Sequence, residues 1–452
     1  MRIHLLCDQK WRDLPNLAAL KLLLEQLGHR VLLSTTKDQH QMIRAFRPDC
    51  VVFNHLFAPA NQQLARDLRA SGVAVVVLPT EGAVRPELMG IADGEFAKDW
   101  SMDLFLAWSA PAADGVRRRW GLDEGAVPVV GCTRFDFYTD RFRCAITPRE
   151  VFCQHHRLDP ARPIVTWATA FGFAGLQHDS VRYARFLAEC EANGLATCYR
   201  RIGVDPRRVP ELFEQGRTRT CAAFVRLAKA RPDVQFIIRP HPVDDRGFYR
   251  AVIENNGLTN VRFCPKDYIW NVLNASHVHL HRHCTTAVEA WMWDKPTIEM
   301  AVDNVREWQW PDREVGSAIV HDASELVDRV DSFLSGRSVE PEIRDYRRGY
   351  IETWFGPQDG RRCVAAANAI DGLMSKIGRR RRFITGIAST PTATRSIATA
   401  VLRHVLGKRP NEPLLRWTSV TKLDPMDKLA TRGEVMVYQR LIADAVAGEA
   451  RR

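Results

Sequence analysis

Polar and cationic side chains gather at the end of one predicted strand in the second half of the chain. The apolar strand at 236–238 runs directly into Arg239-Pro240-His241-Pro242. Proline fixes φ and removes a backbone donor, so this segment must leave the sheet as a rigid turn. An Arg fork suits phosphate oxygens, and a histidine can donate to a phosphate. The pattern predicts that Arg239 and His241 bind a phosphate; the alternative is an ordinary surface loop.

A second polar cluster follows another predicted strand. His283, Thr285 and Thr286 come between that strand and a predicted helix. Hydroxyls and unpaired N–H groups at a helix N-terminus form an anion site, and Glu289 could meet ribose hydroxyls. Thr286 and Glu289 also have the spacing of a capping box, so helix capping alone is the competing interpretation.

Histidines stand at positions 277, 279, 281 and 283. On a strand this period of two puts all four on one face. Metal binding would need a carboxylate or cysteine at a matching spacing, and none stands there, so we expect no metal. His281 and His283, at the strand's end, are the better candidates for ligand contact.

Candidate residues also follow strands in the first half of the chain. Glu81 lies in Thr80-Glu81-Gly82, just after a predicted strand, where a carboxylate is well placed as a general base. Asn54 and His55 end an earlier strand and could bind acceptor hydroxyls. For Glu81 the alternative is a turn with a solvated carboxylate. For Asn54 and His55 the alternative is an ordinary turn that contains a histidine.

Two further positions lie at the predicted sheet edge of the second half. Gly172, in Phe171-Gly172-Phe173, allows a backbone turn close to a ligand, although the glycine spacing is a weak signal. Lys266, beside Asp267, follows the strand at 261–263 and could touch a nucleotide base.

Short apolar strands alternate with helices through most of the chain, which predicts parallel βαβ units. The fold class expected is α/β, with two Rossmann-like domains facing a central cleft. Proline-rich sequence near 143–163 marks the boundary between them. The expected parts are a domain on the acceptor side at 1–145, a nucleotide-sugar domain at 160–340, two helices at 341–378, and a basic, partly amphipathic tail at 379–452. The strands expected are 2–7, 31–34, 51–53, 73–78, 104–107 and 127–130 in the first half, and 164–168, 236–238, 261–263, 277–280, 297–300 and 318–320 in the second.

Composition narrows the class of protein. The net charge of +11 allows nucleic acid, an anionic membrane surface or anionic substrates as partners. No nucleic-acid-binding motif is present, so we expect no nucleic-acid partner. The eleven scattered cysteines show no CxxC spacing, which favours a reducing cytoplasm over disulfides or zinc. The basic and amphipathic region 379–406 predicts peripheral contact with an anionic inner membrane, against the alternative of a solvated charge run.

Together these motifs resemble those of GT-B glycosyltransferases. The likeness is strongest to bacterial surface-carbohydrate biosynthesis proteins and to sialyl-, polysialyl- and Kdo-transferase-like enzymes, which share an acidic-Gly motif, an HP motif and a hydroxyl motif. One departure is Thr80, where relatives often carry a second carboxylate. The matching segments are Thr80-Glu81-Gly82, His241-Pro242, Thr285-Thr286, 130–136, 170–174 and 359–361.

The resemblance implies a metal-independent transfer of sugar from a CMP- or UDP-linked donor to a glycan or glycolipid in capsule or lipopolysaccharide synthesis. Glu81 would be the base, and His241 with Arg239 would bind the donor phosphate. Thr285 and Thr286 would hold phosphate oxygens, and the helices at 341–378 would be crossover helices that return to the first domain. Rival hypotheses are a nucleotide-sugar 2-epimerase of the same fold, which needs no acceptor, and a CDP-polyol phosphotransferase.

Overall fold

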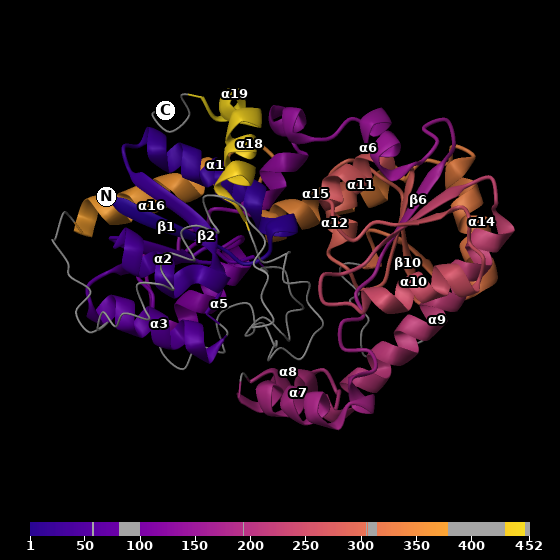
Figure 1. Cartoon of the computed structure of the whole chain (residues 1–452), viewed down its shortest axis with the longest axis horizontal. Coiled ribbons are helices and arrows are strands. Elements are labelled where there is room, and N and C mark those ends of the chain that lie inside the picture. The colour runs from indigo at the N-terminus through magenta and orange to yellow at the C-terminus, as the bar shows by residue number, and fades with distance from the viewer. Residues whose placement is uncertain are drawn as a thin grey trace. The chain divides into compact units, whose positions relative to one another are not determined.

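The chain forms two compact α/β units (Figure 1). The computed structural model describes residues 1–56, 58–80, 100–192, 194–303, 305, 314–377 and 430–447. Within these residues, Met1–Ala145, 352–377 and 430–447 belong to one unit, and Ile146–Ile351 form the other. Each unit contains one parallel sheet. The α/β class expected from the sequence is therefore confirmed.

The sheet of the first unit has five parallel strands in the order β2-β1-β3-β4-β5. On one face, β3 and β4 pack through Val51, Phe53, Val75 and Val77 against the helices that follow them. Its strands are β1 (Arg2–Cys7), β2 (Arg30–Thr35), β3 (Cys50–Phe53), β4 (Ala74–Val77) and β5 (Leu104–Phe105), and its helices before residue 146 are α1 (Lys10–Gln26), α2 (Gln39–Phe46), α3 (Pro59–Ala70) and α5 (Ala110–Trp120), with 3-10 turns η1 (Thr36–Asp38), η3 (Thr133–Tyr138) and η4 (Asp140–Ala145).

The strand expected at 127–130 is wrong. Only an isolated bridge joins Ala107 to Val129 there. The carbonyl of Pro128 accepts a bond from the N–H of Ala107 (3.0 Å), but proline has no N–H to donate in return. A proline in the middle of the segment therefore ends the sheet at β5.

The last described helices return to the first unit. Figure 1 shows α16 (Arg362–Ile377), α18 (Arg432–Leu441) and α19 (Ala443–Val446) beside α1. Lys10 on α1 pairs with Glu434 on α18 at 2.8 Å. Glu434 also closes a capping box with Thr431, which fixes the start of α18. The two helices expected at 341–378 are α15 (Pro341–Phe355) and α16, whereas a return of 430–447 to α1 had no clear sequence signal.

The sheet of the second unit has six parallel strands in the order β11-β10-β9-β6-β7-β8. The strands are β6 (Ile164–Ala168), β7 (Gln235–Arg239), β8 (Val261–Phe263), β9 (Val278–His281), β10 (Thr297–Met300) and β11 (Ala318–Val320), and the helices are α6 (Arg149–His156), α7 (Ser180–Ala192), α8 (Leu195–Arg201), α9 (Val209–Ala230), α10 (Arg246–Asn255), α11 (Ile269–Ala275), α12 (Thr286–Trp291) and α14 (Ala323–Leu334), followed by α15, with 3-10 turns η5 (Leu176–His178) and η6 (Pro206–Arg208).

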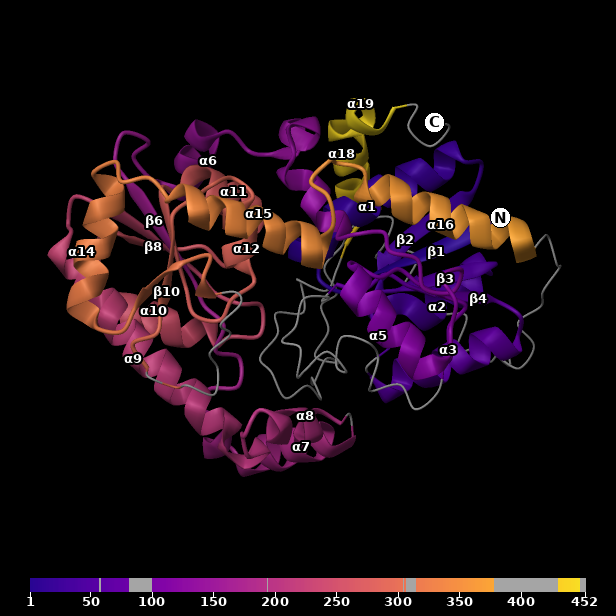
Figure 2. The same cartoon turned by 180° about the vertical axis from the view of Figure 1, so that it is seen from behind.

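Helices cover both faces of this sheet (Figure 2). Along β6 and β7, Trp167 and Phe236 point into a core shared with α9, α10 and α14. Their neighbours Ile164 and Ile237 point into the core beneath α6 and α11. Burial on both faces explains why these strands are continuous apolar runs rather than alternating ones.

All eleven cysteines are free thiols, as their spacing predicted. In the part of the chain that the structure describes, no helix is both long and apolar enough to cross a lipid bilayer.

Candidate functional site

The order of the strands singles out one edge of the second sheet. The chain passes from β6 outward to β7 and β8, then returns to place β9 on the other side of β6. Ligands of open α/β folds bind outside the carboxyl ends of the strands where the strand order reverses in this way. Ala168, the last residue of β6, lies opposite Arg239 of β7 and His281 of β9. The two predicted motifs therefore follow the strands on either side of β6, roughly 10 Å apart.

Asp244 ties the loop after β6 to the turn after β7. Its buried carboxylate accepts the N–H of Phe171 (2.8 Å) and the hydroxyls of Tyr249 (2.9 Å) and Thr169. The hydroxyl of Thr169 in turn accepts the backbone N–H of His241 (3.2 Å). Burial raises the pKa of Asp244, although His241 and the bonded donors oppose this shift. The position of the His241-Pro242 turn is thus fixed by a carboxylate three residues further on.

Gly172 lies where these two loops meet. A Cβ at position 172 would lie 2.2 Å from Cγ2 of Val243. The loop after β6 can therefore approach the His241 turn only because residue 172 is glycine. The contact of Gly172 with a ligand stays a prediction, whereas the structure shows its close packing against the His241 turn.

His241 and Arg239 have different surroundings. His241 is exposed, and its Nδ1 accepts the N–H of Val243 (3.4 Å). Arg239 is buried, and its guanidinium donates to the carbonyls of Pro265 and Asp267, each at 2.7 Å. Arg239 therefore holds the loop after β8 in place here. Its role in phosphate binding stays a prediction, as does the role of His241.

The capping box expected at Thr286 and Glu289 is wrong. Thr285 is the N-cap residue of α12, and no side chain caps this helix. The hydroxyl of Thr286 instead shares a hydrogen bond with Nε2 of His279 (2.9 Å). His279 is buried beside His281, and burial holds its pKa well below the usual value. A buried neutral imidazole needs a polar partner, so the threonine turns inward to supply it.

The other residues of this motif differ in how deeply they are buried. Thr285 and His283 are half-buried at the end of β9, whereas Glu289 is buried in α12. His283 has a φ of +50°, a strained value for a residue with a side chain. The row of four histidines therefore does not continue along one face of β9, which ends at His281. Lys266 is exposed in the loop after β8.

A buried ionic cluster supports the loop after β9. The Arg282 guanidinium donates to both oxygens of Asp303 (2.6 and 2.9 Å) and to Oε1 of Glu299 (2.9 Å). Nδ1 of His281 pairs with Oε2 of Glu299 (2.8 Å), and the N–H of His283 donates to Oε1. Burial alone would raise the pKa of Glu299, but His281, His283 and Arg282 hold it well below its usual value. These bonds fix the backbone of His283.

At the corresponding edge of the first sheet, Asn54 follows β3 as expected. It is buried, and its amide donates to Oδ2 of Asp13 at 3.4 Å. Asp13 also accepts the N–H of Gln9 (3.0 Å), the residue that precedes α1. His55 is half-buried. Glu81, the predicted base, lies outside the described residues, so its role stays a prediction.

Three buried polar groups escaped the sequence reasoning: Asp13, Asp244 and the salt-bridged Arg282. Each lies within six residues of a strand's carboxyl end. A position just after a strand is therefore the only local signal of these residues, and it does not distinguish a side chain that contacts a ligand from one that holds a loop.

Comparison with known proteins gives the fold. No protein-family model and no curated protein matches the chain. Solved structures similar to this chain include three at 12% sequence identity. They are the UDP-GlcNAc 2-epimerase from Neisseria meningitidis bound to UDP-GlcNAc (TM-score 0.52, covering 82% of this chain and 100% of that one), the S. aureus MnaA-UDP complex (0.51, 84% and 99%), and the Methanocaldococcus jannaschii UDP-GlcNAc 2-epimerase with UDP-GlcNAc and UDP (0.50, 82% and 100%).

These matches span nearly the whole of each known structure, so the chain shares their two-sheet α/β fold of the GT-B type. This agrees with the fold expected from the motifs. The narrower resemblance to sialyl- and Kdo-transferase-like enzymes stays a prediction.

Proposed function

We propose that this protein transfers a sugar from a nucleotide-activated donor to a carbohydrate acceptor, and that the second unit binds the donor phosphates. The observation that carries the proposal is the convergence of the His241 turn and the Thr285 loop on either side of Ala168, at the reversal of strand order. The similar solved structures, two of which hold UDP-GlcNAc, support a nucleotide sugar as the ligand.

In this proposal the protein neutralises the leaving phosphate with its own groups. The exposed imidazole of His241 donates to a phosphate oxygen, and the hydroxyl of Thr285 contacts a second one. Arg239 contributes by fixing the loop that carries Lys266, which faces the base of the nucleotide. No divalent cation takes part at the phosphate, so added Mg²⁺ or Mn²⁺ leaves kcat unchanged.

We propose Glu81 as the base that deprotonates the acceptor hydroxyl, with Asn54 and His55 on the acceptor side. Both assignments rest on strand-end position.

The first test is a thermal-shift series with CMP, CDP and UDP, followed by a donor screen with mass spectrometry of the products. His241→Ala should lower kcat by at least ~100-fold, as should Glu81→Ala. His321→Ala is the matched control, since His321 is also exposed at the same edge but follows β11, at the far end of the sheet. Near-normal turnover for both His241→Ala and Glu81→Ala would reject the assignment.

A second candidate function is epimerisation at C2 of the sugar, which the similar solved structures favour. Incubation with UDP-GlcNAc alone separates the two. Formation of the C2 epimer without any acceptor supports the epimerase, whereas acceptor-dependent release of nucleotide supports transfer. A response to CDP alone in the thermal-shift series would favour a polyol phosphotransferase.

We place the reaction in capsule or lipopolysaccharide synthesis at the cytoplasmic face of the membrane, with region 379–406 in contact with anionic lipid. This region lies outside the described residues. The test replaces Arg379, Arg380, Arg381 and Arg382 by Gln in the full chain, which keeps α18 on α1. Sedimentation with phosphatidylserine-containing liposomes should fall; equal binding of the two proteins would reject the membrane contact.

A further inference from the structure

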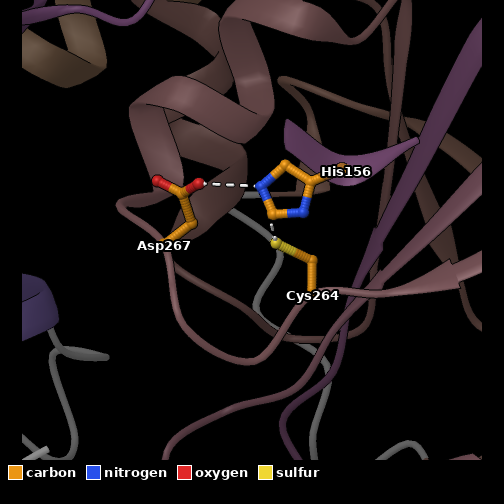
Figure 3. A group of neighbouring side chains, drawn as sticks. All are labelled: His156, Cys264 and Asp267. Carbon is orange, nitrogen blue, oxygen red and sulfur yellow. Dashed lines mark hydrogen bonds and ion pairs between the residues drawn. The ribbon is translucent and has the colours of Figure 1, made fainter. Parts of the chain in front are cut away.

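Three side chains from two distant segments of the second unit point toward one another (Figure 3). His156 is the last residue of α6, and Cys264 and Asp267 lie in the loop after β8. Nε2 of His156 is 3.0 Å from Oδ2 of Asp267 and 3.8 Å from Sγ of Cys264. All three atoms lie within 4.8 Å of one another. Cys264 is buried, and the other two side chains are about one-fifth exposed.

Each of the three side chains is held in this orientation by its neighbours. The ring of Phe152 packs on His156 with a centroid separation of 4.3 Å. Oδ1 of Asp267 accepts the N–H of Tyr268 (2.7 Å) and the amide of Asn271 (2.8 Å). Oδ2 is therefore the oxygen that faces the cluster. Supporting bonds of this kind orient ligand side chains in metal sites.

The backbone that carries Cys264 and Asp267 is also fixed. The N–H of Cys264 donates to the carbonyl of Ile238 in β7 (2.9 Å), and Arg239 donates to the carbonyl of Asp267. The loop is thus bonded to β7 at both Cys264 and Asp267. Its two ligand atoms are therefore already in place before an ion binds.

A proton-relay triad does not fit this geometry. In a relay the acid and the nucleophile contact different nitrogens of the imidazole. Here both contacts converge on Nε2 of His156. Three ligand atoms that converge on one point suit a cation instead, since tetrahedral zinc with bonds of about 2.0 to 2.3 Å places its ligand atoms roughly 3.3 to 3.5 Å apart.

We propose that His156 Nε2, Cys264 Sγ and Asp267 Oδ2 bind one Zn²⁺ ion, whose fourth position is open to solvent. A thiolate, a carboxylate and a neutral imidazole together carry two negative charges, which the ion neutralises. Thiolate and imidazole ligands favour zinc over magnesium or calcium, which prefer oxygen ligands alone.

Binding exchanges protons for the ion. Zn²⁺ binds the thiolate form of cysteine and the neutral form of histidine, so its binding is coupled to the release of protons from these ligands. No redox change is involved.

The second group of potential ligands, His283, Glu299 and Glu314, does not offer an equivalent site. Glu299 already binds the Arg282 guanidinium and His281 through its two oxygens. A divalent cation there would meet a buried positive charge. At His156, Cys264 and Asp267, the guanidinium of Arg239 donates to the main-chain carbonyl of Asp267, and Oδ2 of Asp267 pairs with His156.

No sequence motif marks this site, because His156 and Cys264 are 108 residues apart. The ion would join the end of α6 to the loop that carries Lys266 and contacts Arg239. The proposal does not depend on the sugar-transfer function, and its test measures binding rather than activity.

The test is a titration of the metal-free full chain with Co²⁺, which replaces Zn²⁺ and reports thiolate ligation by a charge-transfer band. We expect saturation at one equivalent, loss of the band in Cys264→Ser, and at least tenfold weaker binding in Asp267→Asn and His156→Gln. Cys144→Ser is the control, because Cys144 is an exposed thiol elsewhere in the chain. Zn²⁺ should displace the Co²⁺ and raise the Tm.

Absence of a band at one equivalent, or a band that Cys264→Ser retains, would overturn the proposal. So would a band that Cys144→Ser abolishes. If Cys264→Ser fails to fold, the affinities of Asp267→Asn and His156→Gln decide: wild-type affinity in both excludes this site, whether or not the protein proves to be a transferase.

Discussion

Asp244 is the group whose removal should most clearly loosen the candidate phosphate site. Asp244→Ala leaves three buried donors without their acceptor: the N–H of Phe171 and the hydroxyls of Thr169 and Tyr249. An unsatisfied buried donor costs about 1 to 3 kcal/mol. Relief of the buried charge and rotation of the two hydroxyls offset part of this cost, so we expect a net loss of about 3 kcal/mol.

The assay is hydrogen exchange measured by mass spectrometry on peptides that contain the loop after β6 and the turn after β7. A local loss of about 3 kcal/mol should speed exchange there by roughly 100-fold. Tyr249→Phe removes only one of the donors and should cost about 1 kcal/mol. Peptides from the first unit serve as the internal reference, because the three side-chain hydrogen bonds of Asp244 described above all go to residues of the second unit.

If the site binds a nucleotide, UDP affinity measured by calorimetry should fall in Asp244→Ala as the His241 turn loosens. Asp244→Asn keeps the shape and one acceptor oxygen, so it should lie between the wild type and Asp244→Ala. Unchanged hydrogen exchange in Asp244→Ala would show that the three bonds do not hold the His241 turn. This result would refute the structural role of Asp244 whether or not the site binds a nucleotide.

Three further predictions concern the packing around the site and the base of α16. Gly172→Ala should destabilise the second unit by about 1 to 3 kcal/mol in urea unfolding, and Val243→Ala should restore part of that loss, because the new Cβ would meet Cγ2 of Val243 at 2.2 Å. No rescue would contradict this contact. Arg282→Met should cost about 3 to 5 kcal/mol because two buried carboxylates lose their cation, and neutralising both carboxylates in the same chain should recover much of it; an equal loss in both variants would exclude the charge as the cause. Burial raises the pKa of Asp136 to about 6 from 3.8, although its carboxylate accepts the first two N–H groups of α16. The folded state therefore binds this proton more tightly, so the stability of the wild type relative to Asp136→Asn should fall by up to about 3 kcal/mol as pH rises from 4 to 7, and a difference independent of pH would contradict it.

Local sequence patterns were enough for most of the fold. Apolar runs such as 164–168 and 236–238 became buried strands because a parallel strand covered on both faces must be apolar throughout. The motif after β7 was placed correctly at a strand's carboxyl end. The strand expected at 127–130 failed because the proline at its centre outweighed the apolar residues around it.

The sequence by itself determined which residues reach the carboxyl edges of the two sheets, since that depends only on the order of strand, turn and helix along the chain. The tertiary structure decided what those residues do there. Whether Arg239 faces a ligand or a backbone carbonyl depends on the loop after β8, 26 residues away. The partner of Thr286 is a buried histidine rather than its own helix, and the ligands of the proposed zinc site meet only when α6 packs beside β8. These outcomes depend on contacts between distant segments and on the cost of leaving a buried polar group unpaired, which no local spacing encodes.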